Sequence, residues 1–137
     1  MRARWGPAEK QVTLSRVDLT ALIQPAFPGQ SVVASELTRG GLANTNVRLE
    51  LSEHPESILL RVYTGHADVG VGAMPATAEK EAALHRLLAP KMPVPRLLFA
   101  DAHSPIAGYP YMLREWVEGE RLEIVAHHLS PSGLMQL

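Results

Sequence analysis

The stretch SILLRVY, residues 57–63, carries one cation inside an otherwise apolar run. Runs of this length with β-branched and aromatic residues favour strands, because such side chains pack well on a pleated surface. A polar turn that contains Pro55 precedes the run, and a Gly-rich connection over 64–75 follows it. The stretch therefore predicts one strand of a sheet, with Arg61 embedded in it.

Two further strands are predicted upstream of this stretch. Residues 46–51 (NVRLEL) alternate strictly between polar and apolar positions, which is the period of a half-buried strand. Residues 31–38 (SVVASELT) also suit a strand, and the glycines of 39–44 (RGGLAN) permit the positive φ angles of a tight reversal. These runs predict neighbouring strands joined by short turns.

The main helix is predicted downstream, over residues 78–88 (AEKEAALHRLL), with Thr77 as its N-cap. Almost all of these residues are good helix formers. The apolar stripe that we expect to be buried consists of Leu84, Leu87 and Leu88. Glu81 lies three positions before Leu84, and therefore on or beside this face. A carboxylate there needs a partner, because burying an unpaired charge is costly.

Three more elements complete the outline. Asp18 is the predicted cap of a short helix over 18–23, which two prolines end. Extended runs over 96–100 and 109–117 add two strands. We therefore predict an α+β domain, in which a mostly antiparallel sheet of about five strands carries one main packed helix and follows a short one.

Composition limits the classes of function. The 137 residues, 46% hydrophobic and 20% charged, suit one compact domain. No stretch approaches the roughly 20 apolar residues of a spanning helix, and the N-terminus lacks a secretory apolar core. Thirteen basic and fourteen acidic residues, spread along the chain, form no stripe for nucleic acid. The absence of cysteine excludes thiolate chemistry and fits a reducing compartment. We expect a cytoplasmic protein that binds neither nucleic acid nor membrane.

Five segments carry a family resemblance through their order and spacing. They are GGLANTN (40–46), ILLR (58–61), EAAL (81–84), VPRLL (94–98) and MLREWVEG (112–119). Together they resemble the N-terminal, nucleotide-binding lobe of the aminoglycoside phosphotransferase and choline kinase-like family, distant relatives of protein kinases. The resemblance runs from about Glu36 to Leu122 and implies a protein-kinase-like N-lobe.

This resemblance divides the chain into three parts. Residues 1–30 would be an N-terminal segment with a short helix, and residues 31–122 the nucleotide-binding lobe. Residues 123–137 would be a linker and the start of a truncated C-lobe.

The resemblance also implies which residues face the phosphates. Gly40 and Gly41 would fold over the triphosphate and offer backbone N–H donors to its oxygens. Asn44 matches the asparagine that commonly follows this turn in the family. Arg61 stands where kinases place a lysine that holds the α- and β-phosphates and pairs with a helix carboxylate. Glu81 matches that carboxylate.

The last segment would hold the base. The resemblance implies that the backbone of Glu115 and Val117 hydrogen-bonds the adenine edge, and that Met112 lines the pocket behind it. Gly119 would turn the chain toward a second lobe. Met112 is also apolar enough to be plain core, and the sequence leaves both roles open.

The implied function is phosphoryl transfer from ATP, with GTP as the alternative, to a small-molecule hydroxyl. The family's catalytic loop, His-Gly-Asp followed by Asn, lies in the C-terminal lobe, and this sequence contains no His-Gly-Asp. We therefore expect a lobe truncated before the catalytic loop and inactive alone. Mg²⁺ and the acceptor would bind only with the C-lobe, and the exposed lobe interface predicts self-association. The alternatives are a non-catalytic nucleotide- or partner-binding module and an inactive gene fragment.

Each assignment has a plainer alternative. The Gly-Gly pair is common in ordinary hairpin turns. Arg61 could be a solvent-facing or edge-strand cation, and Glu81 an exposed carboxylate paired with Lys80 or His85. Arginine at position 61 also differs chemically from the lysine that kinases carry there, because its planar guanidinium with five donors does not place the charge where a compact ammonium would. One geometric prediction separates these interpretations: in a kinase-like lobe, the side chains of Arg61 and Glu81 lie close together.

Overall fold

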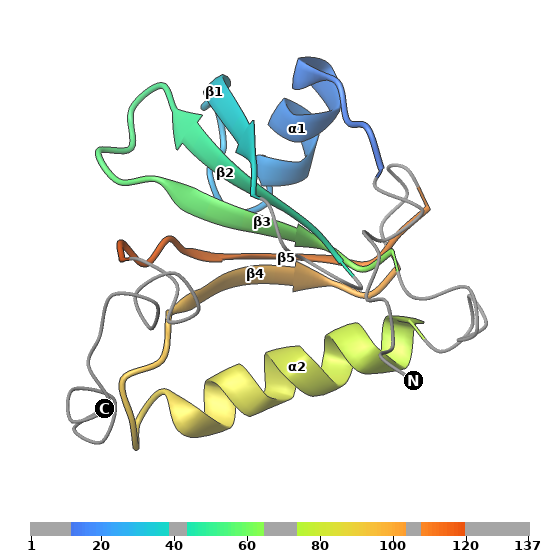
Figure 1. The fold of residues 1–137 in the computed structure, drawn as a ribbon, viewed down its shortest axis with the longest axis vertical. Helices are drawn as coiled ribbons and strands as arrows, with labels where there is room; N and C mark the ends of the chain where they lie inside the picture. The colour runs from blue at the N-terminus through green and yellow to red at the C-terminus, as the bar shows by residue number, and fades with distance from the viewer. Residues whose placement is uncertain (1–11, 39–43, 65–73, 104–107, 120–137) are drawn as a thin grey trace, which may run out of the picture.

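The computed structural model of the protein describes residues 12–38, 44–64, 74–103 and 108–119. These residues form two helices and five strands (Figure 1). In chain order the elements are α1 (Arg16–Ile23), β1 (Val32–Leu37), β2 (Thr45–Leu51), β3 (Ile58–Val62), α2 (Met74–Leu88), β4 (Leu97–Asp101) and β5 (Tyr111–Glu115). No helix within the described ranges is long and apolar enough to cross a membrane.

The five strands form one sheet in the order β1-β2-β3-β5-β4, and every neighbouring pair is antiparallel. The predicted α+β class, with an antiparallel sheet, one main helix and a preceding short one, is therefore confirmed. β3, which contains the SILLRVY stretch, is central, because β2 pairs with one side of it and β5 with the other. Arg61 thus lies inside the sheet, not on an edge strand.

One face of the sheet packs against α1 and holds the larger core. Because successive side chains of a strand point to opposite faces, alternate residues of β2, β3 and β5 face this core. Leu49, Leu60 and Leu113 are fully buried there, together with Ile23 of α1. The Tyr111 hydroxyl donates a hydrogen bond of 3.0 Å to the carbonyl of Leu22, which joins β5 to α1.

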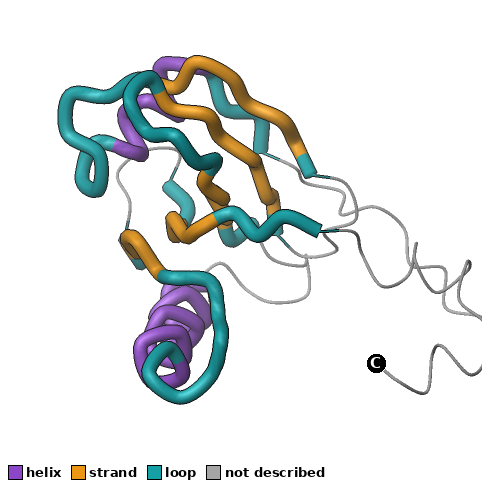
Figure 2. Tube along the Cα trace, turned by 90° about the vertical axis from the view of Figure 1, so that its left-hand side faces the viewer, coloured by secondary structure: helices purple, strands orange, loops and turns teal. Residues whose placement is uncertain are grey.

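The other face of the sheet carries α2, which lies along β4 (Figures 1 and 2). A smaller buried cluster joins Tyr63 after β3, Met112 of β5 and Ala78 of α2. The two clusters therefore lie on opposite faces of β3 and β5. The face with the smaller cluster is also the one that carries Arg61, because Arg61 and Met112 are paired in register.

The predicted buried stripe of α2 is wrong. Leu84 and Leu87 are 45% and 58% exposed and Leu88 is half-buried, whereas Ala78 and Ala82 are each 2% exposed. Alanine side chains are short, so they allow the helix to approach the sheet and bring Glu81 toward it. The helix therefore meets the sheet through its alanines and Glu81, and Leu87 lies on the outer side.

Both predicted helix starts also differ from the observed ones. Ser15, not Asp18, caps α1: the Asp18 N–H donates to Ser15 Oγ (3.2 Å), and the Ser15 N–H donates to Asp18 Oδ2 (2.9 Å). This reciprocal pair is a capping box, with Asp18 in the third helical position. α2 begins at Met74, so Thr77 lies inside the helix. Pro75 falls in the first turn, where a missing N–H costs no helical hydrogen bond.

Candidate functional site

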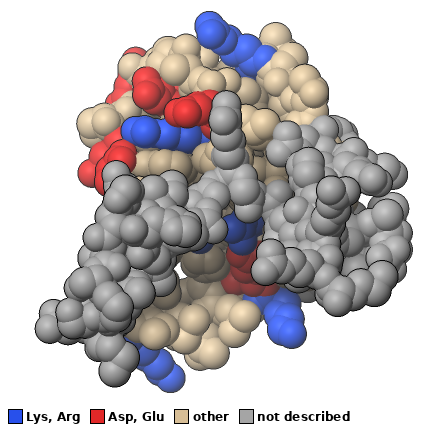
Figure 3. Space-filling view, in the orientation of Figure 1, with Lys and Arg blue, Asp and Glu red and all other residues tan. Residues whose placement is uncertain are grey.

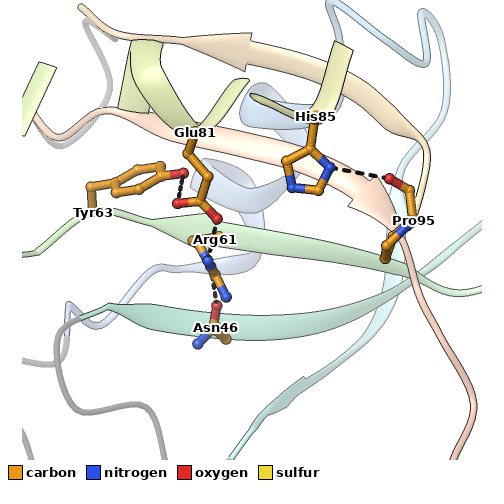
Figure 4. Close-up of polar contacts among 6 residues, drawn as sticks. All are labelled: Asn46, Arg61, Tyr63, Glu81, His85 and Pro95. Carbon is orange, nitrogen blue, oxygen red and sulfur yellow. Dashed lines mark hydrogen bonds and ion pairs between the residues drawn. The ribbon is translucent and has the colours of Figure 1, made fainter. Parts of the chain in front are cut away.

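An ion pair between Arg61 of β3 and Glu81 of α2 lies at the centre of the candidate site (Figure 4). The donor is Nη1 of Arg61 and the acceptor is Oε1 of Glu81. Both side chains are about three-quarters buried, with 22% and 26% of their surface exposed. The structure therefore confirms that the two lie close together, and it contradicts the alternative of a solvent-facing Arg61. Glu81 pairs with Arg61, not with Lys80 or His85.

Two further side chains hold this pair in place. The Tyr63 hydroxyl donates to Oε2 of Glu81 at 2.6 Å, and Nε of Arg61 donates to Oδ1 of Asn46 at 3.0 Å. Both oxygens of Glu81 are therefore engaged, and the guanidinium is held on two sides. Burial and the hydrogen bond to Glu81 raise the pKa of Tyr63 well above its usual value, so it stays a donor at neutral pH.

The arrangement leaves Arg61 with donors to spare. A guanidinium carries five N–H groups in one plane. Asn46 and Glu81 engage its Nε and Nη1. The remaining N–H groups can donate hydrogen bonds to the oxygens of an anion that lies in the plane of the guanidinium. Asn46 and Glu81 fix the direction in which these N–H groups point.

β5 supplies the neighbouring part of the same sheet face. Met112 is fully buried and lies opposite Arg61 in the β3–β5 register. Arg114 follows two positions later, on the same face. It is half-buried, and no group in the described part of the chain accepts a hydrogen bond from its buried Nε. Burial and then the charge of Arg61 lower the pKa of Arg114.

The end of β5 and the residues that follow it contact charged side chains. Nε of Arg96 contacts Oε1 of Glu115 at 2.9 Å, and the Glu115 backbone N–H donates to the Arg96 carbonyl at 3.0 Å. The guanidinium of Arg48 lies 5.0 Å from the ring centre of Trp116 and contacts Glu118 at 3.0 Å. The Glu115 N–H is therefore already used by a contact within the chain.

The remaining predicted site residues are placed as follows. Asn44 lies at the bend before β2 and is half-buried, and the side chain of Val117 is 62% exposed. Gly119 has a φ of +152°, a conformation that favours glycine and suits a change of chain direction. Gly40 and Gly41 lie outside the described residues.

Three residues of the site, Asn46, Tyr63 and Arg114, are not among those predicted from the sequence. Tyr63 and Arg114 each lie two positions from a predicted site residue, so the period of a strand places each on that residue's face. Asn46 gives no such signal, since its position opposite Arg61 depends on the register of β2 and β3.

Metal ligands do not gather at this site. Among the described residues, no group of three or more His, Cys, Asp or Glu side chains could hold a metal ion.

Comparison with known proteins shows the fold. No protein-family model and no curated protein matches the sequence. Three solved structures match 80%, 86% and 88% of the chain, with TM-scores of 0.57, 0.56 and 0.53 and identities of 18%, 20% and 20%. In that order they are a protein from Ralstonia eutropha JMP134 assigned as an aminoglycoside phosphotransferase, a mutant aminoglycoside 2′-phosphotransferase-IIIa with GDP, and APH(2″)-IIIa with GDP and kanamycin.

The match covers a limited part of those proteins. This chain spans 30–35% of their length, about a third. Its antiparallel sheet and packed helix have the fold of a kinase-like N-lobe. The resemblance that the sequence motifs indicated is therefore confirmed at the level of the fold.

Proposed function

We propose that this chain binds a purine nucleoside triphosphate and forms the nucleotide-binding lobe of a small-molecule phosphotransferase. The observation that carries the proposal is the Arg61–Glu81 ion pair between β3 and α2. Kinases hold the α- and β-phosphates of their nucleotide with a strand cation that pairs with a helix carboxylate. The fold that surrounds the pair here is of the same kind.

Arg61 would bind the α- and β-phosphates through the N–H groups that Asn46 and Glu81 leave unused. Hydrogen bonds between a guanidinium and phosphate oxygens are charge-assisted and frequently bidentate. Because its partners already orient Arg61, binding the phosphates needs little reorganisation. Gly40, Gly41 and Asn44 would complete the phosphate end of the site.

The base would lie at the end of β5. Its polar edge would meet the carbonyl of Glu115 and the N–H of Val117, and Met112 would line the pocket behind it. The GDP bound in two of the similar structures favours testing a guanine nucleotide beside ATP.

Phosphoryl transfer needs more than this lobe holds. The reaction needs a group that orients the acceptor hydroxyl and a metal that spreads the phosphate charge. The sequence contains no His-Gly-Asp motif, and the described residues bring no three His, Asp or Glu side chains together as metal ligands. We therefore assign this chain the binding and positioning of the nucleotide. Mg²⁺, the acceptor and the chemical step belong to a second lobe of a complete phosphotransferase.

Equilibrium binding tests the proposal. Calorimetry with ATP and GTP in turn is expected to show saturable binding of at least one nucleotide. Arg61→Met keeps an apolar side chain and removes the guanidinium. Nucleotide binding is expected to weaken at least tenfold, since a hydrogen bond to a charged group contributes about 1.5–3 kcal/mol. Arg16→Met, on the exposed surface of α1, is the matched control. No binding of either nucleotide, or equal binding by Arg61→Met, would contradict the proposal.

A further inference from the structure

A recess of about 260 Å³ lies beside the ion pair, between the last two turns of α2 and the sheet. Its apolar walls are Leu84 and Leu88 of α2, with Val94 and Pro95 from the segment before β4. The space-filling view shows the surface hollowed between the sheet and the helix (Figure 3). Leu84 and Leu88 follow Glu81 by three and seven positions, so they lie on the helix face that carries this carboxylate and line the opening.

Arg114 is the cation of this recess. It reaches the recess from β5, and its Nε is buried with no acceptor among the described residues. A buried N–H without an acceptor is destabilising, and native proteins rarely leave one unsatisfied. An acceptor that reaches Nε from the recess would therefore remove a cost that the folded chain carries.

The local charges favour an anionic acceptor. Glu81 also lines the recess, but both of its oxygens are engaged by Arg61 and Tyr63. The ion pair with Arg61 offsets the charge of Glu81, so the guanidinium of Arg114 supplies the net positive charge of the recess lining.

His85 adds no negative charge to the recess. Its Nδ1 lies 3.2 Å from the Pro95 carbonyl oxygen, as Figure 4 shows. Because a carbonyl oxygen only accepts, Nδ1 carries the hydrogen in this contact.

We propose that the recess binds a small organic carboxylate with an apolar body, whose carboxylate accepts hydrogen bonds from Arg114. The apolar body would lie against Leu88 and Val94. A volume of about 260 Å³ is just below the usual range for small-molecule pockets, which favours a single-ring or short branched acid. The proposal does not depend on nucleotide binding, because Arg114 and these walls are not part of the proposed phosphate site.

Titration of the full chain with benzoate tests this site, with benzamide and sulfate as the matched probes. Benzamide keeps the ring and removes the charge, while sulfate keeps a charge and removes the ring. Benzoate is expected to raise the melting temperature saturably, as ligands of the folded state do, and both other probes are expected to have much smaller effects. In ¹⁵N spectra, the Arg114 Nε–H signal is expected to shift along the same benzoate titration curve.

Arg114→Met removes the cation and keeps an apolar stem of similar length, so benzoate affinity is expected to fall at least tenfold. Arg86→Met is the control, because Arg86 is an exposed cation of the same helix and does not line the recess. Equal benzoate binding by Arg114→Met, an equal response to sulfate, or no saturable benzoate response would each overturn the proposal. If Arg114→Met does not fold, the Nε–H shift in the unmodified chain decides the question.

Discussion

Asn46 Oδ1 accepts a hydrogen bond of 3.0 Å from Nε of Arg61, across directly paired positions of β2 and β3. Glu81 contacts the same guanidinium from α2. The side chain that we propose for phosphate binding is therefore held by one neighbour in the sheet and one in the helix. A guanidinium that is already held on two sides loses less conformational entropy when it binds an anion.

Asn46→Ala removes the sheet contact and leaves the ion pair in place. We expect nucleotide affinity to fall several-fold, because Arg61 loses part of its orientation, and the melting temperature to change little. Calorimetric titration and thermal unfolding measure the two effects. Glu50→Ala, at an exposed position of the same strand, is the control. Unchanged affinity in Asn46→Ala would show that Asn46 does not position Arg61.

Glu81→Ala is expected to destabilise the fold, because it leaves Nη1 of the mostly buried Arg61 and the Tyr63 hydroxyl without the carboxylate that accepts from both. A loss of about 1–3 kcal/mol in the free energy of unfolding is expected for a buried polar group deprived of its partner. Urea denaturation measures this loss. In a double-mutant cycle with Arg61→Met, the two changes should not add, since the residues are in contact. Additive losses would show that the pair contributes no coupling.

Tyr111→Phe is expected to alter the stability of the protein at alkaline pH. Burial, and to a lesser extent the charge of Asp101, raises the pKa of Tyr111 to about 12, against 10.0 in an unperturbed phenol. The folded state therefore keeps the proton longer than the unfolded state. The stabilisation is complete below about pH 10 and is lost as the pH rises from 10 toward 12.

The experiment compares the free energy of unfolding of the two proteins at pH 8 and pH 11. At pH 8 the unmodified protein should be more stable by about 1 kcal/mol, the usual contribution of a hydrogen bond such as that from Tyr111 to Leu22. At pH 11 this advantage should be smaller, because phenylalanine cannot ionise. An advantage that stays constant between the two pH values would contradict the expected linkage.

Leu87→Glu tests the expected self-association. Leu84, Leu87 and Met92 leave about half of their surfaces exposed on and just after α2, which supports an association surface there. We expect sedimentation velocity to show a smaller average mass for Leu87→Glu, with the melting temperature unchanged. Val17→Glu, at an exposed position of α1, is the control. A purely monomeric unmodified chain would contradict this expectation.

The strands and the helix could be predicted because their signals are local. The alternation in residues 46–51 and the apolar run around Arg61 identify strands wherever their partners lie, since the period of two comes from the backbone itself. The composition of α2 identifies a helix because helix propensity is also a local property of each residue. The Arg61–Glu81 contact was predictable because the resemblance to a kinase-like lobe implies that the strand cation and the helix carboxylate form a pair.

The face of α2 that meets the sheet could not be predicted from its leucines. A stripe of leucines shows that a helix is amphipathic, but the contact also depends on the space above the sheet and on the charge that must be satisfied there. Ala78 and Ala82 allow Glu81 to reach Arg61, and this arrangement leaves Leu84 and Leu87 outside. Capping of α1 by Ser15 was missed because Ser15 and Asp18 are both good caps by residue type.

By itself, the amino-acid sequence determined the elements and their order, and its resemblance to a kinase-like lobe indicated the two charges that would meet. Tertiary structure alone decided that Asn46 lies opposite Arg61, that alanines form the contact of α2, and that Arg114 has a buried Nε beside a recess. Local patterns depend on backbone geometry that each residue carries with it. Register, helix facing and burial depend on residues far apart in the chain, and only packing brings these together.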